Sequence, residues 1–306
     1  AYILLSPFNQ IISAIAQIGN AAGSFERVND LLQVATSDPL SANVQVPAAW
    51  DIVAKNLSFS YGEQPVLREL CFDIAAGSYV GIVGSVGSGK STLLSLLARI
   101  LSPAAGQLQV GSVSLAEMDR DTLCSSIALV PQKDQIFEGT VMDNVTLGLE
   151  VQGVEPGIAR ERAASLIKSY GLAGFESARP GALSGGMRQR VAFMRTLALD
   201  PKAILLDEPF SALDFQTRLV LQGDVRRIIR DRNKSAILVT HDIGEAVAMA
   251  DRVLVLSHRP STVKAIYDID LGVAEDDPIA LRRSTRFNDH FDAIWSDLDI
   301  QVSSTV

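Results

Sequence analysis

The segment from Gly84 to Thr92 combines glycines, a lysine and hydroxyl side chains in an order suited to binding phosphate. It reads Gly84-Ser85-Val86-Gly87-Ser88-Gly89-Lys90-Ser91-Thr92 and matches the pattern G-x-x-x-x-G-K-[ST]. The glycines let successive backbone N–H groups turn inward and form an anion nest where a helix begins. Lys90 would supply a positive charge to the outer phosphates, and the Ser91 hydroxyl could ligate Mg²⁺. The alternative is a Gly/Ser loop that only caps a helix.

Two carboxylates, Asp207 and Glu208, follow the apolar run from Ile204 to Leu206. In phosphate-loop NTPases a carboxylate at the end of a neighbouring strand holds the Mg²⁺, and Asp207 fits that role. Glu208 would then face the γ-phosphate and could orient or deprotonate the attacking water. The alternative is that both acids cap the element that Pro209 begins.

His241 follows another apolar run that ends at Thr240. A lone histidine at a strand end is more often structural than catalytic, so its interpretation depends on the residues that accompany it.

The elements that must position these residues alternate between strands and helices. Apolar patterning predicts a helix from 90 to about 100 and a mostly helical segment from about 140 to 200. It predicts strands over 52–61, 66–74, 79–83, 203–206, 236–240 and 253–257. This alternation predicts an α/β fold with a parallel sheet.

Composition limits the classes of partner. The 306 residues carry a formal net charge of −8, which argues against a nucleic-acid surface. We interpret the one basic cluster as the solvated face and end of a helix. Its members are Arg226, Arg227, Arg230, Arg232 and Lys234. The two cysteines, Cys71 and Cys124, lie beside apolar residues and are expected to be buried, reduced thiols.

The stretch Leu183-Ser184-Gly185-Gly186-Met187-Arg188-Gln189-Arg190 resembles the signature motif of ABC ATPases. Ser-Gly-Gly opening a helix makes a second anion-binding N-terminus. The resemblance implies that this nest serves the ATP bound by a partner subunit, so that two domains enclose two nucleotides.

The resemblance extends over about residues 50 to 260 and implies further roles. Tyr61 resembles the aromatic platform that stacks on adenine, and Gln132 the glutamine that senses Mg²⁺ and the attacking water. Asp214 resembles the residue that communicates across the dimer, and His241 the switch histidine at the γ-phosphate. The implied catalytic residues are Glu208, His241, Lys90 and Gln132. The implied ATP-binding residues are Tyr61, 84–92, Ser184, Gly185, Gly186 and Asp214, and the implied Mg²⁺ ligands are Ser91, Gln132 and Asp207.

The implied fold is a phosphate-loop NTPase core with a parallel sheet, an antiparallel β subdomain and an α-helical signature subdomain, preceded by an N-terminal helix. We expect the end of a membrane-domain helix and its connector at 1–35 and a linker at 36–50. The ATPase domain is expected at 51–260, with the helical subdomain at about 133–195. We expect a C-terminal extension at 261–306, either an amphipathic helix that packs on the domain or a regulatory element.

Two kinds of transporter are suggested by different parts of the chain. The segment 132–144 and the N-terminal stretch are similar to exporters, which predicts a half-transporter with membrane and ATPase domains in one chain. The segments 186–191, 207–214 and 241–246 resemble importer ATPases of the nitrate, sulfonate and taurine type, so the alternative is a separate ATPase subunit. Either reading implies that the chain forms a homodimer or pairs with another ABC ATPase domain. It also implies a transmembrane domain, in the same chain or in a separate permease, and a location at the cytoplasmic face of the membrane. No nucleic-acid partner is expected. Family members that act on ribosomes or DNA repair complexes are a third, less favoured class.

Overall fold

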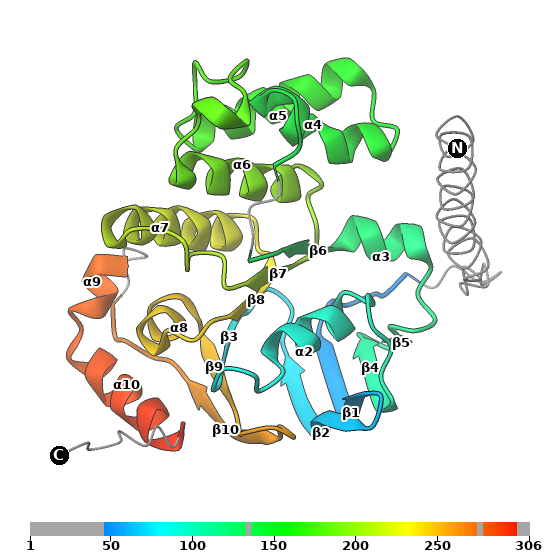
Figure 1. Cartoon of the computed structure of the whole chain (residues 1–306), viewed down its shortest axis with the longest axis vertical. Coiled ribbons are helices and arrows are strands. Elements are labelled where there is room, and N and C mark those ends of the chain that lie inside the picture. The colour runs from blue at the N-terminus through cyan, green and yellow to red at the C-terminus, as the bar shows by residue number, and fades with distance from the viewer. Residues whose placement is uncertain (1–45, 133–135, 274–277, 299–306) are drawn as a thin grey trace, which may run out of the picture. The chain divides into compact units, whose positions relative to one another are not determined.

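The computed structural model describes residues 46–132, 136–273 and 278–298 (Figure 1). The expected membrane-helix end at 1–35 and most of the expected linker at 36–50 lie outside the described residues.

A six-stranded sheet forms the centre of the described chain, with the order β10-β9-β3-β8-β7-β6. All neighbouring strands pair in parallel except β10, which runs antiparallel to β9. Because helices cover both faces of a parallel sheet, its strands β3, β6, β7, β8 and β9 are almost wholly apolar, whereas the antiparallel edge strand β10 alternates between half-buried and exposed residues. The bounds are β3 Tyr79–Val83, β6 Ile127–Val130, β7 Ala203–Asp207, β8 Ser235–Val239, β9 Arg252–Leu256 and β10 Val263–Asp268. The predicted apolar strands at 79–83, 203–206, 236–240 and 253–257 are confirmed to within one residue.

A second, antiparallel sheet has the order β2-β1-β4-β5. Its strands are β1 Ile52–Tyr61, β2 Gln64–Ile74, β4 Ala105–Val110 and β5 Val113–Ser114. Helix α2, Lys90–Leu97, joins the two sheets: its Leu93 and Leu94 share one hydrophobic core with Leu57 of β1 and Ile237 of β8. The start of α2, where the phosphate pattern lies, is therefore fixed by packing on both sides.

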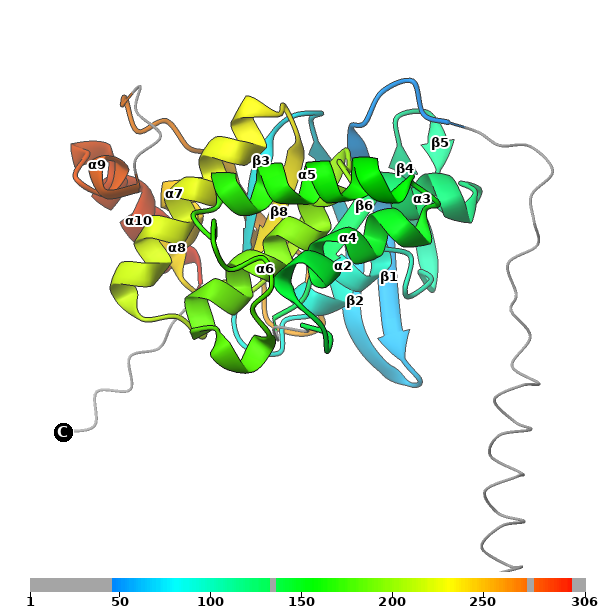
Figure 2. The ribbon, with the colours of Figure 1, turned by 90° about the horizontal axis from the view of Figure 1, so that it is seen from above.

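The segment predicted to be mostly helical forms a separate group of helices at the top of Figure 1. It contains α4 Val141–Val151, α5 Pro156–Ser169 and α6 Gly185–Ala198, with a short 3-10 turn at Pro180–Ala182. Figure 2 shows the same three helices lying together when the molecule is seen from above. Helix α3, Arg120–Ser126, contacts β6, and helix α8, Ile243–Met249, contacts β3. Helix α7, Phe215–Asp231, contacts α6 and α9, Pro278–Arg282.

Of the two alternatives for the C-terminal extension, the amphipathic helix matches α10, Thr285–Asp297, which follows α9, Pro278–Arg282. Its Phe287 and Ile294 are buried in the core that also holds α8. The Tyr267 hydroxyl of β10 donates to Asp297 Oδ2 at 2.6 Å, which ties the end of α10 to the sheet. The sheet itself continues past residue 260 to Asp268.

Two expectations about polar and thiol side chains are wrong. Arg226 and Lys234 are buried rather than solvated, because each has an acceptor within hydrogen-bond or ion-pair distance. The Arg226 guanidinium donates to the carbonyls of Ala248 and Met249 at the end of α8, and Lys234 Nζ lies 2.8 Å from Asp200 Oδ1. Cys71 and Cys124 are free, as expected, but exposed, because their strand and helix turn those positions outward.

Within the described part of the chain, none of the helices combines the length and apolar character that a bilayer crossing requires.

Candidate functional site

The residues predicted to bind the phosphates and the metal and to handle the water lie at or just after the carboxyl ends of four strands that are neighbours in the central sheet. The order β3-β8-β7-β6 places the loop after Val83, His241, the Asp207–Glu208 pair and Gln132 side by side. Because parallel strands end at the same edge of a sheet, ligands of open α/β folds bind there. Segments far apart in sequence thus form one site.

The loop after β3 has the backbone geometry of a phosphate cradle. Gly87 and Gly89 have φ angles of 81° and 93°, a region that favours glycine. A Cβ added to Gly89 would lie 2.8 Å from side-chain carbons of both Val66 and Leu67. Gly89 caps α2 without any side-chain hydrogen bond, so the first N–H groups of the helix are not taken by a capping side chain. The predicted nest is therefore built from backbone alone, which suits a phosphate.

Lys90 lies at the inner side of this loop. Its ammonium donates to the carbonyls of Gly84 and Ser85, each at 2.9 Å, and the residue is only 6% exposed. Burial lowers the pKa of Lys90, and the nearby carboxylates of Glu208 and Asp207 oppose that shift. These carboxylates favour the charged ammonium, which is the form that binds phosphate.

Ser91 and Asp207 form the pair expected to face a metal ion. Ser91 Oγ donates to Asp207 Oδ1 at 2.9 Å. Burial raises the pKa of the Asp207 carboxyl, and the hydrogen bond from Ser91 opposes that rise. The described residues contain no group of three or more metal-ligating His, Cys, Asp or Glu side chains. Mg²⁺ in nucleotide sites needs only one or two protein oxygens besides phosphates and water, so this pair fits it.

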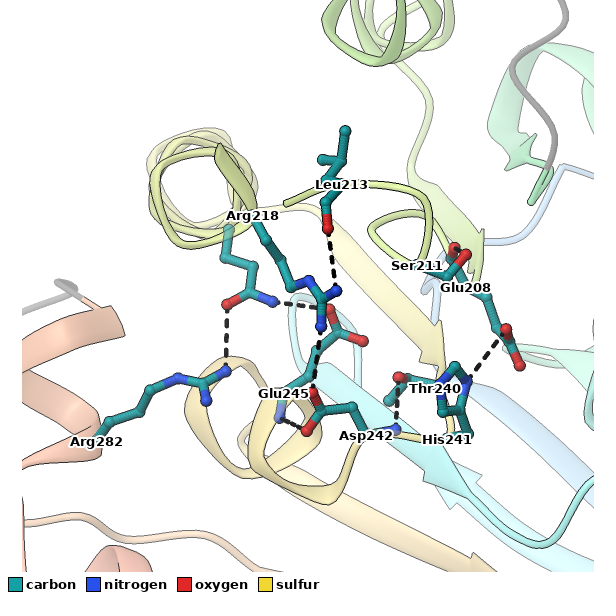
Figure 3. A network of polar contacts seen from close by, with 10 residues as sticks. Glu208, Ser211, Leu213, Arg218, Thr240, His241, Asp242, Glu245 and Arg282 are labelled. Atoms are coloured by element: carbon teal, nitrogen blue, oxygen red, sulfur yellow. Dashed lines mark hydrogen bonds and ion pairs between the residues drawn. The ribbon is translucent and has the colours of Figure 1, made fainter. Parts of the chain in front are cut away.

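Glu208 contacts two other predicted residues at this edge, Gln132 and His241. Its Oε2 accepts a hydrogen bond from Gln132 Nε2 at 3.1 Å and lies 3.2 Å from His241 Nδ1 (Figure 3 shows the His241 contact). The Glu208 backbone has a φ of 45°, which is strained for a residue other than glycine. Its N–H donates to the Val239 carbonyl, which helps to hold that conformation. Gln132 contacts Glu208 rather than Asp207, so its predicted role at the metal remains a prediction.

The predicted signature residues lie on a different element. Ser184 caps α6, and its Oγ accepts from the Met187 N–H at 3.3 Å. A Cβ added to Gly186 would lie 2.6 Å from Thr217 Cγ2, so glycine is required where α6 meets α7. Asp214 caps α7 by accepting from the Thr217 N–H at 3.0 Å. Hydrogen bonds from the side chain and the backbone N–H of Thr217 lower the pKa of the Asp214 carboxyl. In the described structure, 184–186 make no hydrogen bond with the 84–92 loop of their own chain.

Tyr61 ends β1 beside the start of α2. Its ring is 52% exposed and meets Phe59 edge to face, with 4.9 Å between centroids. The Tyr61 hydroxyl lies 3.5 Å from Thr92 Oγ1. An aromatic surface is therefore available next to the cradle, where a base attached to the phosphates could stack.

Polar residues behind the site were not identified from the sequence. Asp242 caps α8 by accepting from the Glu245 N–H at 3.0 Å, and Arg218 Nη1 lies 3.6 Å from Asp242 Oδ2 (Figure 3). The Asp-x-x-Glu spacing is a helix-start signal that could have located this cap. Nothing in the local pattern indicates that Arg218, on another helix, would be its partner.

Comparisons with known proteins agree with this geometry. A family model described as ABC transporter matches residues 67–211. The chain is 38% identical over 234 residues to an uncharacterized ABC transporter ATP-binding protein, YtlC, of Bacillus subtilis (strain 168), covering 76% of this chain and 88% of that protein. It is 40% identical to the aliphatic sulfonates import ATP-binding protein SsuB of Pseudomonas entomophila (strain L48), covering 71% and 77%. It is 38% identical to the taurine import ATP-binding protein TauB of Yersinia pestis bv. Antiqua (strain Antiqua), covering 71% and 85%.

Two solved structures show a similar fold. One is a dimeric ATP-binding cassette in a post-hydrolysis state bound to ADP and Pi, with a TM-score of 0.63 and 28% identity, covering 72% of this chain and 99% of that one. The other is a bacterial Atm1-family ABC exporter with ATP bound, with a TM-score of 0.70 and 24% identity, covering 96% of this chain and 50% of that one. The predicted fold class is thereby confirmed.

Proposed function

Because this chain belongs to the family of ABC transporter ATP-binding proteins, it is an ATPase coupled to transport, and we propose that it hydrolyses ATP as a dimer with two nucleotides at the interface. The observation that carries the proposal is the position of Glu208. It follows the strand that ends in Asp207, and it contacts both Gln132 and His241. A carboxylate that is held by a strained backbone beside a phosphate cradle is suited to orienting or deprotonating the attacking water.

The proposed mechanism assigns each residue a role in positioning or charge stabilisation, which dominate phosphoryl transfer. The backbone nest at 84–89 and Lys90 hold the phosphates. Ser91 and Asp207 would hold Mg²⁺, which neutralises phosphate charge when bound. Glu208 orients the water and accepts its proton, and His241 donates a hydrogen bond to the γ-phosphate.

The signature segment supports the dimeric arrangement. A helix N-terminus that opens with Ser184-Gly185-Gly186 suits a phosphate, yet in its own chain it makes no hydrogen bond to the 84–92 loop. The proposal is that each signature segment completes the site of the partner subunit, with Asp214 near the same interface. The solved dimer with ADP and Pi supports this assembly.

For the type of transporter, the relatives favour the importer alternative over the fused exporter. SsuB and TauB are both named import ATP-binding proteins, and they are 40% and 38% identical to this chain over the aligned residues. The exporter shares only its fold at 24% identity, so the expected fused half-transporter gains no support from it. We propose an importer-type ATPase that acts on a transmembrane permease. Sequencing upstream of the Ala1 codon tests this, because membrane-spanning helices in the same reading frame would contradict a separate subunit.

Hydrolysis by the unmodified chain tests the enzymatic proposal. We expect phosphate release that requires Mg²⁺, stops with EDTA, and rises more steeply than the protein concentration because a dimer is the active species. The measurement is phosphate release over a range of protein concentrations. No release at any concentration, with ATP and Mg²⁺ in excess, would contradict the proposal.

Replacing Tyr61 by Ala is expected to weaken ATP binding about tenfold, since stacking of a base on an aromatic ring contributes ~1–3 kcal/mol. Titration calorimetry with ATP measures the change. Tyr61→Phe keeps the ring and loses only the hydroxyl near Thr92, so its Kd should stay close to that of the unmodified chain. Equal losses in both variants would show that the ring does not stack on adenine.

A further inference from the structure

A chain of hydrogen bonds leads from the C-terminal helices to the helix that follows His241. Arg282, the last residue of α9, donates through Nη2 to Gln222 Oε1 at 3.4 Å. Gln222 is fully buried in α7, and its Nε2 donates to Glu245 Oε1 at 2.7 Å. Figure 3 shows Arg282 extending toward the part of the network that contains Glu245. Gln222 thus connects Arg282 of α9 to the buried carboxylate of Glu245 in the first turn of α8.

The hydrogen-bond network continues to the two residues on either side of His241. The Glu245 N–H donates to Asp242 Oδ1, and the Asp242 N–H donates to Thr240 Oγ1, each at 3.0 Å. Thr240 and Asp242 are the immediate neighbours of His241. The position of the imidazole relative to Glu208 therefore depends on how the first turn of α8 is held.

A second branch connects the same turn to the segment before Asp214. Arg218 lies 3.6 Å from Asp242 Oδ2 and donates through Nη2 to the Leu213 carbonyl at 3.1 Å. The network therefore touches two segments that the proposed function places at the γ-phosphate and at the dimer interface.

The packing at Gly244 is a separate observation that the C-terminal helices α9 and α10 fit closely against the start of α8. A Cβ at this position would lie 3.2 Å from Asp242 Oδ1, 3.3 Å from Arg282 Nη1 and 3.6 Å from Phe287 Cζ. Glycine weakens a helix interior, and Gly244 has no left-handed backbone that would require it. Its small size leaves room for Arg282, whose guanidinium also lies over the Phe287 ring at 6.0 Å from the centroid.

We propose that Arg282 is a positioning residue for His241, through which the docked C-terminal helices α9 and α10 set the rate of ATP hydrolysis. The inference rests on the proposed function and deepens it. Its physical basis is that Gln222 and Glu245 are buried, where an unpaired polar atom is costly. Without the Arg282 guanidinium, Gln222 loses the hydrogen-bond donor that orients its side-chain amide. The Glu245 side chain, and with it the first turn of α8, is then held less firmly.

The test compares Arg282→Met with Arg283→Met in the full chain. Methionine keeps most of the aliphatic bulk, and Arg283 is an exposed neighbour outside the network. We expect kcat for ATP hydrolysis to fall about tenfold in Arg282→Met, with KM changed less than about twofold, because a hydrogen bond to a charged group is lost. Arg283→Met should match the unmodified chain. Arg282→Lys keeps a charged donor and should show a smaller loss; it replaces the Met variant if that protein does not fold.

A His241→Ala background separates positioning from general destabilisation. If Arg282 acts through His241, Arg282→Met should cause little further loss of kcat once the imidazole is absent. The same fold-loss in both backgrounds would overturn the proposal, because a purely structural role would not depend on His241.

Amide hydrogen exchange gives a readout that does not need catalysis. Arg282→Met should speed exchange at 241–246, while exchange at 90–97 stays unchanged. An unmodified chain that hydrolyses no ATP would contradict the proposed function. An active chain whose Arg282→Met variant keeps both its kcat and its exchange rates would overturn the positioning role alone.

Discussion

Glu208→Gln is expected to lower kcat for ATP hydrolysis by about 10²–10³-fold, within the range that a positioned general base contributes. Glutamine has nearly the same shape and can still accept a hydrogen bond from Gln132, but it cannot take a proton from the attacking water. Lys90, Ser91 and Asp207 are untouched, so the Kd for ATP should change little. Phosphate release gives kcat, and titration calorimetry gives the Kd.

The matched control is Glu161→Gln, which makes the same chemical change on the exposed face of α5. Its kcat should equal that of the unmodified chain. Because Glu208→Gln binds ATP without consuming it, the dimer should accumulate when ATP is added, which light scattering detects. If the Glu208→Gln protein keeps more than about a tenth of normal activity, Glu208 does not act as the general base. Positioning of the water and the phosphates would then supply most of the rate enhancement.

The part of the site that lies on strand ends could be predicted from the sequence alone. Each parallel strand of the central sheet is a short, mostly apolar run, and a polar residue lies within two positions of its carboxyl end. Since parallel strands end at one edge, Lys90, Asp207 and His241 follow from local patterns plus one topological rule. The contact between Gln132 and Glu208 does not follow in this way, because it depends on the order of β6 and β7 in the sheet. The family resemblance predicted a role for Gln132 at the Mg²⁺ and the attacking water, but not this contact.

The buried polar residues could not be predicted, because their partners are remote in sequence. Arg226 lies in a run of basic residues that is typical of a solvated helix face, yet it is buried at the carbonyl end of α8. Arg282 belongs to an amphipathic tail, and its partner Gln222 lies 60 positions earlier. Periodicity identifies which face of a helix is apolar, but not which distant acceptor makes the burial of a charge favourable.

Mixing two inactive variants, Lys90→Met and Ser184→Arg, is expected to restore ATP hydrolysis. Lys90→Met disables the phosphate cradle of its own chain. Ser184→Arg places a bulky side chain at the exposed start of α6 and disables the signature nest. In a mixed dimer one site receives both defects, whereas the other receives an intact cradle from one chain and an intact nest from the other. Phosphate release from the separate and mixed proteins is the measurement. Equal mixing should recover about a quarter of normal activity, since half of the dimers are mixed and each has one working site of two.

A second mixture shows whether the recovery comes from a shared site. Lys90 and Glu208 lie at the same sheet edge of one chain, and the Glu208 charge bears on the pKa of the lysine. Mixing Lys90→Met with Glu208→Gln should therefore restore nothing, because every site in that mixed dimer carries one of the two defects. Recovery in the first mixture and none in the second would place the signature segment of each chain at the nucleotide of its partner. If the Ser184→Arg mixture also stays inactive while mixed dimers form, the nest at 184–186 serves its own chain, and the two-nucleotide arrangement would have to be given up.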